Sequence, residues 1–218
     1  MGELLSDPRN LAVFIQLLSA IFSLIYYDKY KKVPVLKLFP FLLWYILFNE
    51  VLGFCIRQYI SDHNAIIYNV YYGINFTYLL ILYRRYLTNK KSKHLVLGFL
   101  ILYLLAYVLE GFFKNYIKEF QTTAYIIASL CLIITIILYF VEILNSNKIL
   151  AIKKNLLFWI SVGLLIYYAG YTPYRIIRNI YTELDKSSAI IAVMITLTVI
   201  MNTCYIIGFI WSQKKEQY

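Results

Sequence analysis

Four polar side chains lie deep inside long apolar stretches of this sequence, where an uncompensated polar group is costly. They are Gln16, Glu50, Asn75 and Asn202, and each lies near the centre of a different apolar run. A carboxylate at the centre of a membrane helix costs a few kcal/mol on insertion scales, about 2.5–3.5 for Asp, so a partner, a proton or water is expected beside it. Glu50 is therefore the residue that the sequence marks most clearly for ligand binding or proton coupling.

The other polar groups at this depth have two interpretations. Asn and Gln in membrane helices commonly bond to a neighbouring helix, which contributes roughly 0.6 kcal/mol, and deep tyrosines either pack in a core or line a cavity. The alternative is a shared site near the bilayer midplane, built from several helices. The candidate ligand-binding residues are Gln16, Glu50, Asn75, Tyr78, Tyr167 and Asn202.

Three arginines lie towards the ends of two apolar runs. Arg57 follows Glu50 by seven residues, two turns along the same helix face. Arg175 and Arg178 follow Pro173, where a helix is expected to kink because proline has no backbone N–H. These arginines could line an outer vestibule and bind an anionic ligand through their planar guanidinium groups. The alternative is that they extend to lipid phosphates.

Several enzyme classes are disfavoured by residues that the apolar runs lack. The histidines are His63 and His94, and both lie between runs, so no run carries the ligands of a haem, a di-iron site or an intramembrane zinc protease. Cys55, Cys131 and Cys204 have no metal-ligand spacing. We expect no metal and no cofactor, and enzymatic activity is not favoured.

Apolar runs dominate the chain and predict its fold class. Of 218 residues, 61% are hydrophobic and 15% are charged, against about 45–50% and about 25% in soluble domains. Seven runs approach or exceed the roughly 20 residues that cross a bilayer as a helix. They cover residues 8–27, 36–60, 65–87, 95–113, 123–144, 156–180 and 189–211. The prediction is an all-α, polytopic membrane protein with seven transmembrane helices in one domain, 1–218.

The basic residues predict the orientation of these helices. Loops rich in Lys and Arg stay in the cytoplasm, and an outer N-terminus places fourteen of the 21 on that side. We therefore expect an N-terminus outside, a C-terminus in the cytoplasm, and a multi-pass protein of a cell membrane such as the bacterial inner membrane. Glu110, towards the outer end of its run, is expected to be an ordinary boundary residue near interfacial water.

An internal repeat is a further prediction. The segments 8–87 and 123–212 share orientation, with 95–113 as a linker helix, and Asn75-Phe76-Thr77-Tyr78 aligns with Asn202-Thr203-Cys204-Tyr205. Such a 3+1+3 parallel repeat resembles the architecture of SWEET sugar facilitators and PnuC-type vitamin transporters. The likeness covers topology, charge orientation and chain length, and no binding residue is carried over from either family.

These observations lead to three hypotheses about function. The first is a small-solute transporter or facilitator with a polar site near the bilayer midplane. The second is a sensor, receptor or membrane subunit that binds a ligand and signals through a separate cytoplasmic protein. The third is a lipid-modifying enzyme. The expected partners are the lipid bilayer, a small solute or anionic ligand and a cytoplasmic protein, whereas nucleic acid is not expected, because the basic residues do not share one face.

Overall fold

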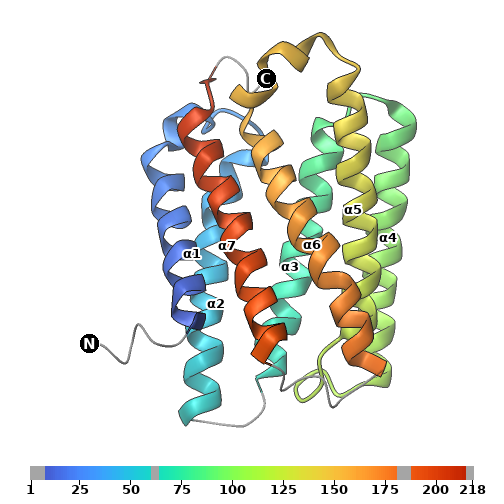
Figure 1. The fold of residues 1–218 in the computed structure, drawn as a ribbon. Helices are drawn as coiled ribbons and strands as arrows, with labels where there is room; N and C mark the ends of the chain where they lie inside the picture. Colours follow the sequence, from blue (N-terminus) through green and yellow to red (C-terminus); the bar gives the residue numbers. More distant parts are fainter. Residues whose placement is uncertain (1–7, 60–63, 181–187, 215–218) are drawn as a thin grey trace. The chain divides into compact units, whose positions relative to one another are not determined.

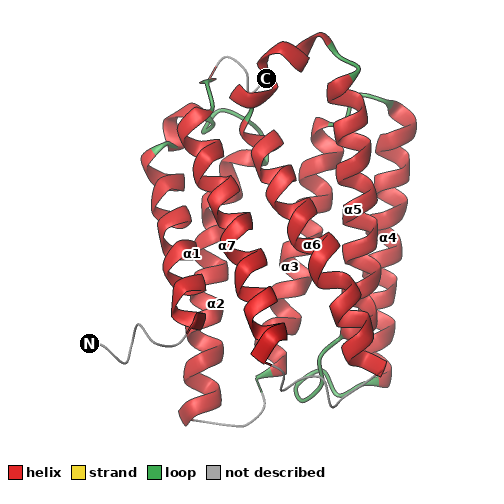
Figure 2. Cartoon of the chain, in the orientation of Figure 1, coloured by secondary structure: helices red, strands yellow, loops and turns green. Residues whose placement is uncertain are grey.

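The computed structural model describes residues 8–59, 64–180 and 188–214, and this part of the chain consists of helices and connecting loops (Figure 2). The expected all-α class is confirmed. Seven α-helices lie in the described part (Figure 1), namely α1 (Pro8–Ile25), α2 (Phe39–Tyr59), α3 (Ala65–Tyr86), α4 (Lys90–Phe113), α5 (Thr122–Leu144), α6 (Leu156–Ile180) and α7 (Ser188–Trp211). Short 3₁₀ segments, η2 (Tyr27–Lys29), η3 (Leu36–Leu38) and η4 (Asn147–Lys154), form parts of the connections.

Five of the seven helices begin within one residue of their predicted apolar runs, and α2 and α4 are the exceptions. α4 begins at Lys90, five residues before its apolar run, because the Asn89 side chain accepts a hydrogen bond from the Lys91 amide (2.9 Å) and caps the helix. α2 begins at Phe39, three residues after the start of its apolar run, so Pro40 lies in the first turn. A proline is tolerated there because its missing N–H would have no helical partner.

Six helical segments are long and apolar enough to cross a membrane. They are Leu36–Gly53, Ala65–Tyr86, Lys90–Phe113, Thr122–Leu144, Leu156–Ile177 and Ile191–Trp211. Large apolar side chains are exposed along them, such as Leu105 (57%) and Leu109 (54%) on α4, which suits lipid and not water. The chain is therefore a multi-pass helical membrane protein.

The first predicted span differs from the other six. α1 has 18 residues, which gives a length of about 27 Å, slightly less than the roughly 30 Å of a hydrocarbon core. Its described apolar stretch, Asn10–Ile25, is shorter still. A seventh crossing and the predicted orientation therefore remain predictions.

The chain divides into two compact units. The terminal unit comprises Met1–Trp44 and Ile143–Tyr218, and the central unit comprises Tyr45–Glu142. α1, α6 and α7 belong to the terminal unit, whereas α3, α4, nearly all of α5 and most of α2 belong to the central unit. The units follow packing and do not coincide with the two sequence halves, so the internal repeat remains a prediction.

In the terminal unit, α7 packs against both α1 and α6 (Figure 1). Glycines allow α6 and α7 to approach closely. A Cβ added at Gly163 would lie 2.9 Å from the Met201 carbonyl oxygen, and one added at Gly208 would lie 2.7 Å from Trp159 Cβ. Small residues commonly give membrane helices this kind of contact.

A lysine after α1 holds the C-terminal end of α7. The Lys29 ammonium donates to the carbonyl oxygens of Phe209 and Ile210, each at 2.8 Å, and so satisfies carbonyls that have no helical partner. Burial lowers the pKa of Lys29. Next to it, the Tyr30 hydroxyl donates to the Ser23 carbonyl (2.5 Å) and its ring stacks on Phe209. These contacts join the last turns of α1 and α7.

In the central unit, tyrosines of α4 bond to the backbone of α3. The Tyr103 hydroxyl donates to the Tyr72 carbonyl (2.9 Å), and the Tyr107 hydroxyl donates to the Asn69 carbonyl (3.0 Å). The Tyr72 ring also meets the Tyr125 ring of α5, with centroids 4.9 Å apart. Several deep tyrosines therefore have a packing role.

Candidate functional site

Asn202 joins two helices of the terminal unit. It is 2% exposed, its side-chain oxygen accepts a hydrogen bond from the Ser19 hydroxyl of α1 (2.7 Å), and its amide nitrogen donates to the Thr198 carbonyl (2.9 Å). The same hydroxyl lies 2.9 Å from the Gln16 carbonyl oxygen. These contacts match the first interpretation of the deep amides, in which they hold helices together.

Gln16 differs from Asn202 although both contact Ser19. Its side-chain oxygen is buried and has no hydrogen-bond partner among the described residues. Most buried polar groups in proteins do have such a partner. Gln16 therefore stays a candidate for ligand contact within the terminal unit.

The remaining members of the predicted midplane site are divided between the units. Asn75 is buried and Tyr78 half-buried in the central unit. Tyr167 is half-buried in the terminal unit, where its ring stacks on Tyr171 at 5.6 Å. The six candidates thus belong to both units, and their assembly into one site remains a prediction.

Of the three arginines, the structure describes the side chain of Arg175. It is 5% exposed in α6, and one of its terminal nitrogens lies 3.4 Å from the Tyr171 hydroxyl. A side chain so buried contacts protein and not lipid headgroups. The side chains of Arg57 and Arg178 lie outside the described residues, and the outer anion site remains a prediction.

Glu50 lies on α2 in the central unit, beside a tyrosine of α3. Its side chain is half-buried, and the Tyr68 hydroxyl lies within hydrogen-bonding reach of its carboxylate. Gly53, one turn later on the same helix face, makes this contact possible. A Cβ at Gly53 would lie 2.8 Å from the Tyr68 hydroxyl oxygen, so a larger residue here would require the tyrosine side chain to shift.

The α3 face that meets α2 is rich in tyrosine. Tyr68, Tyr71 and Asn75 recur at helical spacing and share one side of α3. The Tyr71 ring lies 6.3 Å from the ring of Tyr45 on α2. This side of α3 therefore contacts α2 at two positions, through Tyr68 and through Tyr71.

Two other glutamates in membrane-spanning helices of the central unit have clear structural roles. One Glu142 carboxylate oxygen accepts from the Thr88 amide (2.6 Å) and hydroxyl (2.9 Å), which fixes the turn before α4. Glu110 pairs with Lys114 at 2.6 Å. Glu50, by contrast, forms no ion pair with any basic side chain of the described residues.

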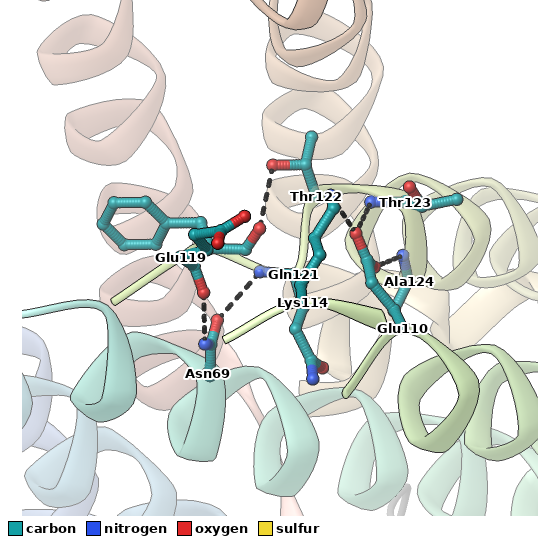
Figure 3. Close-up of polar contacts among 9 residues, drawn as sticks. Asn69, Glu110, Lys114, Glu119, Gln121, Thr122, Thr123 and Ala124 are labelled. Carbon is teal, nitrogen blue, oxygen red and sulfur yellow. Dashed lines mark hydrogen bonds and ion pairs between the residues drawn. The ribbon is translucent and has the colours of Figure 1, made fainter. Parts of the chain in front are cut away.

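Glu110 is a structural residue whose surroundings the sequence analysis predicted wrongly. It is 8% exposed and does not face interfacial water. Its two carboxylate oxygens accept hydrogen bonds from the backbone amides of Thr123 (3.1 Å) and Ala124 (2.7 Å), and so cap the start of α5 (Figure 3). The signal in the sequence was the spacing of Glu110 and Lys114, four residues apart on one helix face.

Asn69 holds the loop between α4 and α5 (Figure 3). Its amide nitrogen donates to the carbonyl oxygens of Tyr116 and Glu119, each at 2.8 Å, and its side-chain oxygen accepts from the Gln121 amide at 3.0 Å. All these contacts are to backbone groups of the loop. The cluster at this end of the central unit is therefore structural, which leaves Glu50, Asn75 and Tyr78 as the candidate site residues of that unit.

No family model, curated protein or solved structure matches this chain. The architectural resemblance to SWEET and PnuC-type transporters gains no support from these comparisons. A function for the chain must therefore be inferred from the chemistry of Glu50 and its neighbours.

Proposed function

We propose that this membrane protein is a small-solute transporter or facilitator in which Glu50 binds a cation or a proton during transport. The observation that supports it is the contrast among the three glutamates. Glu110 and Glu142 fix helix ends, whereas Glu50 lies in a span beside a tyrosine hydroxyl, without a basic partner among the described residues. A carboxylate in a membrane span is costly without a function.

The proposal includes the predicted topology and further candidate residues in each unit. The N-terminus is outside and the C-terminus is in the cytoplasm. Asn75 and Tyr78 are further candidate ligand contacts of the central unit, and Gln16, Tyr167 and Asn202 are candidate ligand contacts of the terminal unit. Gln16 supports this extension, because its buried side-chain oxygen has no partner among the described residues.

Flux through reconstituted vesicles tests the proposal. Vesicles that contain the full chain are offered a defined mixture of amines, amino acids, nucleosides and sugars, and uptake is measured by mass spectrometry against protein-free vesicles. We expect the wild type to move at least one class, and Glu50→Gln to lose that flux or its pH dependence, since the amide is nearly isosteric but cannot hold a charge.

The matched control is Glu119→Gln, which removes the same charge from an exposed loop position. It should leave flux unchanged. Wild-type uptake equal to that of protein-free vesicles for every solute would overturn the transporter proposal and favour the sensor or membrane-subunit alternative. Equal flux in Glu50→Gln and wild type would remove Glu50 from the mechanism.

A further inference from the structure

Five basic side chains flank the short turn between α3 and α4. Arg84 and Arg85 lie in the last turn of α3, and α4 begins at Lys90. Because Lys90 follows Arg85 by five residues, their Cα atoms are at most about 18 Å apart. This group, the basic turn, consists of Arg84, Arg85, Lys90, Lys91 and Lys93. Lys93 is half-buried, and the other four side chains are exposed.

Glu142 of α5 fixes the backbone of this turn. Its carboxylate accepts hydrogen bonds from the amides of Thr88 (2.6 Å) and Asn89 (3.3 Å). Asn89 in turn caps α4 through the Lys91 amide. The two basic helix ends are therefore held close together by backbone contacts, which do not use their charged groups.

The basic turn carries more positive charge than nearby acids neutralise. No ion pair of the described residues includes any of its five side chains. The acids outside the described residues are Glu3, Asp7, Asp62, Glu183, Asp185 and Glu216. In the predicted topology only Glu216 shares a membrane side with the basic turn, and there it follows two lysines of its own segment. One carboxylate neutralises one charge at most, so the excess remains.

The length of α4 places the basic turn at the depth of lipid headgroups. Residues 95–113 form the apolar part of α4 and span about 28 Å as a helix, close to the roughly 30 Å of a hydrocarbon core. The helix begins five residues earlier, at Lys90, and so extends about 7.5 Å further. A headgroup layer adds about 5–8 Å on each side of the hydrocarbon. The lysines of the first turn of α4 therefore lie within that layer.

An exposed stripe on α4 continues from the basic turn along the hydrocarbon. Its members follow one another at spacings of four and three residues and share one helix face, and they are Lys91, Leu95, Gly98, Leu102, Leu105 and Leu109. A Cβ at Gly98 would meet nothing within 4 Å, so no other side chain covers the stripe at that point. The opposite face, with Val96 and Tyr103, is buried. An acyl chain on this stripe would bring its headgroup to Lys91.

The other end of α4 has no such excess of charge. Lys114 pairs with Glu110, and Lys118 is followed by Glu119 in the exposed part of the next loop. Two lysines there are matched by two glutamates. A lipid that gains from positive charge should therefore distinguish the two ends of this one helix, whereas a zwitterionic lipid should not.

We propose that the basic turn and the exposed stripe of α4 form a binding site for a phospholipid with an anionic headgroup. The headgroup phosphate accepts hydrogen bonds from the lysine and arginine side chains, and an acyl chain lies along the stripe. A lipid suits this position better than a soluble acidic partner, because charge and apolar surface are continuous across the headgroup boundary. The proposal does not depend on solute transport.

The test reads lipid preference at each end of α4 separately. Leu95→Trp places a reporter beside the basic turn, and Phe112→Trp places one at the opposite end of the helix, where the side chain is 81% exposed. The full chain is reconstituted in phosphatidylcholine vesicles that contain either phosphatidylglycerol or phosphatidylcholine brominated on the acyl chains. Bromine quenches tryptophan on contact, so titration of each brominated lipid gives its relative affinity at the reporter. The native tryptophan signal is subtracted by using the chain without a reporter.

We expect phosphatidylglycerol to be preferred at least fivefold at Leu95→Trp and not at Phe112→Trp. Replacing Lys90 and Lys91 with glutamine should lower this preference at least fivefold, a ratio that corresponds to the roughly 1 kcal/mol contributed by one basic residue at an anionic surface. Lys32→Gln with Lys37→Gln is the matched control. It removes two exposed lysines of the terminal unit and should leave the preference unchanged.

Equal affinity of the two lipids at Leu95→Trp would overturn the proposal and favour an acidic soluble partner for the basic turn. An equal preference at both reporters, or one that survives the loss of Lys90 and Lys91, would also overturn it. If the double glutamine variant does not fold, the Leu95→Trp chain is measured in 1 M NaCl, where the Debye length is about 3 Å. The preference should then largely disappear, and an unchanged preference would refute an electrostatic site.

Discussion

Gly53→Ala is expected to displace the tyrosine that contacts Glu50. The added Cβ would lie 2.8 Å from the Tyr68 hydroxyl oxygen, 3.1 Å from Cζ and 3.2 Å from Cε2, whereas ordinary contact begins at 3.4 Å. The hydroxyl must therefore move by about 0.6 Å, the difference between 2.8 and 3.4 Å, and the ring must move with it. Overpacking of this kind costs about 1–3 kcal/mol.

Gly98→Ala provides the reference for this substitution. Gly98 lies in α4, and a Cβ there meets nothing within 4 Å. Both substitutions gain the same helix propensity, about 0.8–1 kcal/mol, so their difference isolates the clash. In a denaturation assay of the full chain in detergent micelles, followed by circular dichroism, Gly53→Ala should be less stable than Gly98→Ala by about 1–3 kcal/mol.

A second variant assigns the clash to the Tyr68 hydroxyl. Tyr68→Phe removes the atom at 2.8 Å and leaves the ring carbons at 3.1 and 3.2 Å, so the difference between the alanine variants should shrink in that background. If Gly53→Ala is as stable as Gly98→Ala, the close contact of the Tyr68 side chain with Gly53 is refuted. If Gly53→Ala is still less stable than Gly98→Ala by the same amount in the Tyr68→Phe background, the clash does not involve the Tyr68 hydroxyl.

Three further perturbations test other contacts. Ser19→Ala removes the 2.7 Å bond to Asn202 and should lower stability in the same assay by about 0.6 kcal/mol, and by no more than roughly 1.7. Glu110→Gln breaks the 2.6 Å pair with Lys114 and weakens the α5 cap, and should cost about 1–3 kcal/mol. Lys114→Met should then add little in a double-mutant cycle, and full additivity would contradict the pairing. Because burial lowers the pKa of Lys29, the unfolded state binds more protons between that lowered value and about 10.4, so stability should rise with pH in this window. Thermal unfolding of wild type and Lys29→Met should show this rise in the wild type alone, and parallel pH profiles would argue against it.

Hydropathy identified the helices well because membrane insertion depends on local composition. Any stretch of about 20 apolar residues can satisfy its own backbone as a helix and its side chains with lipid. Twelve of the fourteen helix ends lie within two residues of the predicted bounds, and the exceptions are the starts of α2 and α4. Asn89 starts α4 five residues before its apolar run by accepting from the Lys91 amide.

The roles of polar side chains depended on helix rotation and register, which hydropathy does not contain. Asn202 and Ser19 are 183 residues apart in the chain and meet because α1 packs on α7. Glu110 caps a helix 14 residues away, because the α4–α5 loop returns the chain to it. Neither contact can be read from the composition of a single segment.

Sequence alone marked Glu50 as the exceptional residue, because the energetic cost of a carboxylate in an apolar run is a property of that run. The surroundings of Glu50 came only from tertiary structure. Gly53 allows Tyr68 to approach α2, and Tyr45 and Tyr71 meet across the same pair of helices. The physical reason is that depth in a membrane is set by position along one helix, whereas the chemistry of a site is set by which face of a second helix turns towards it.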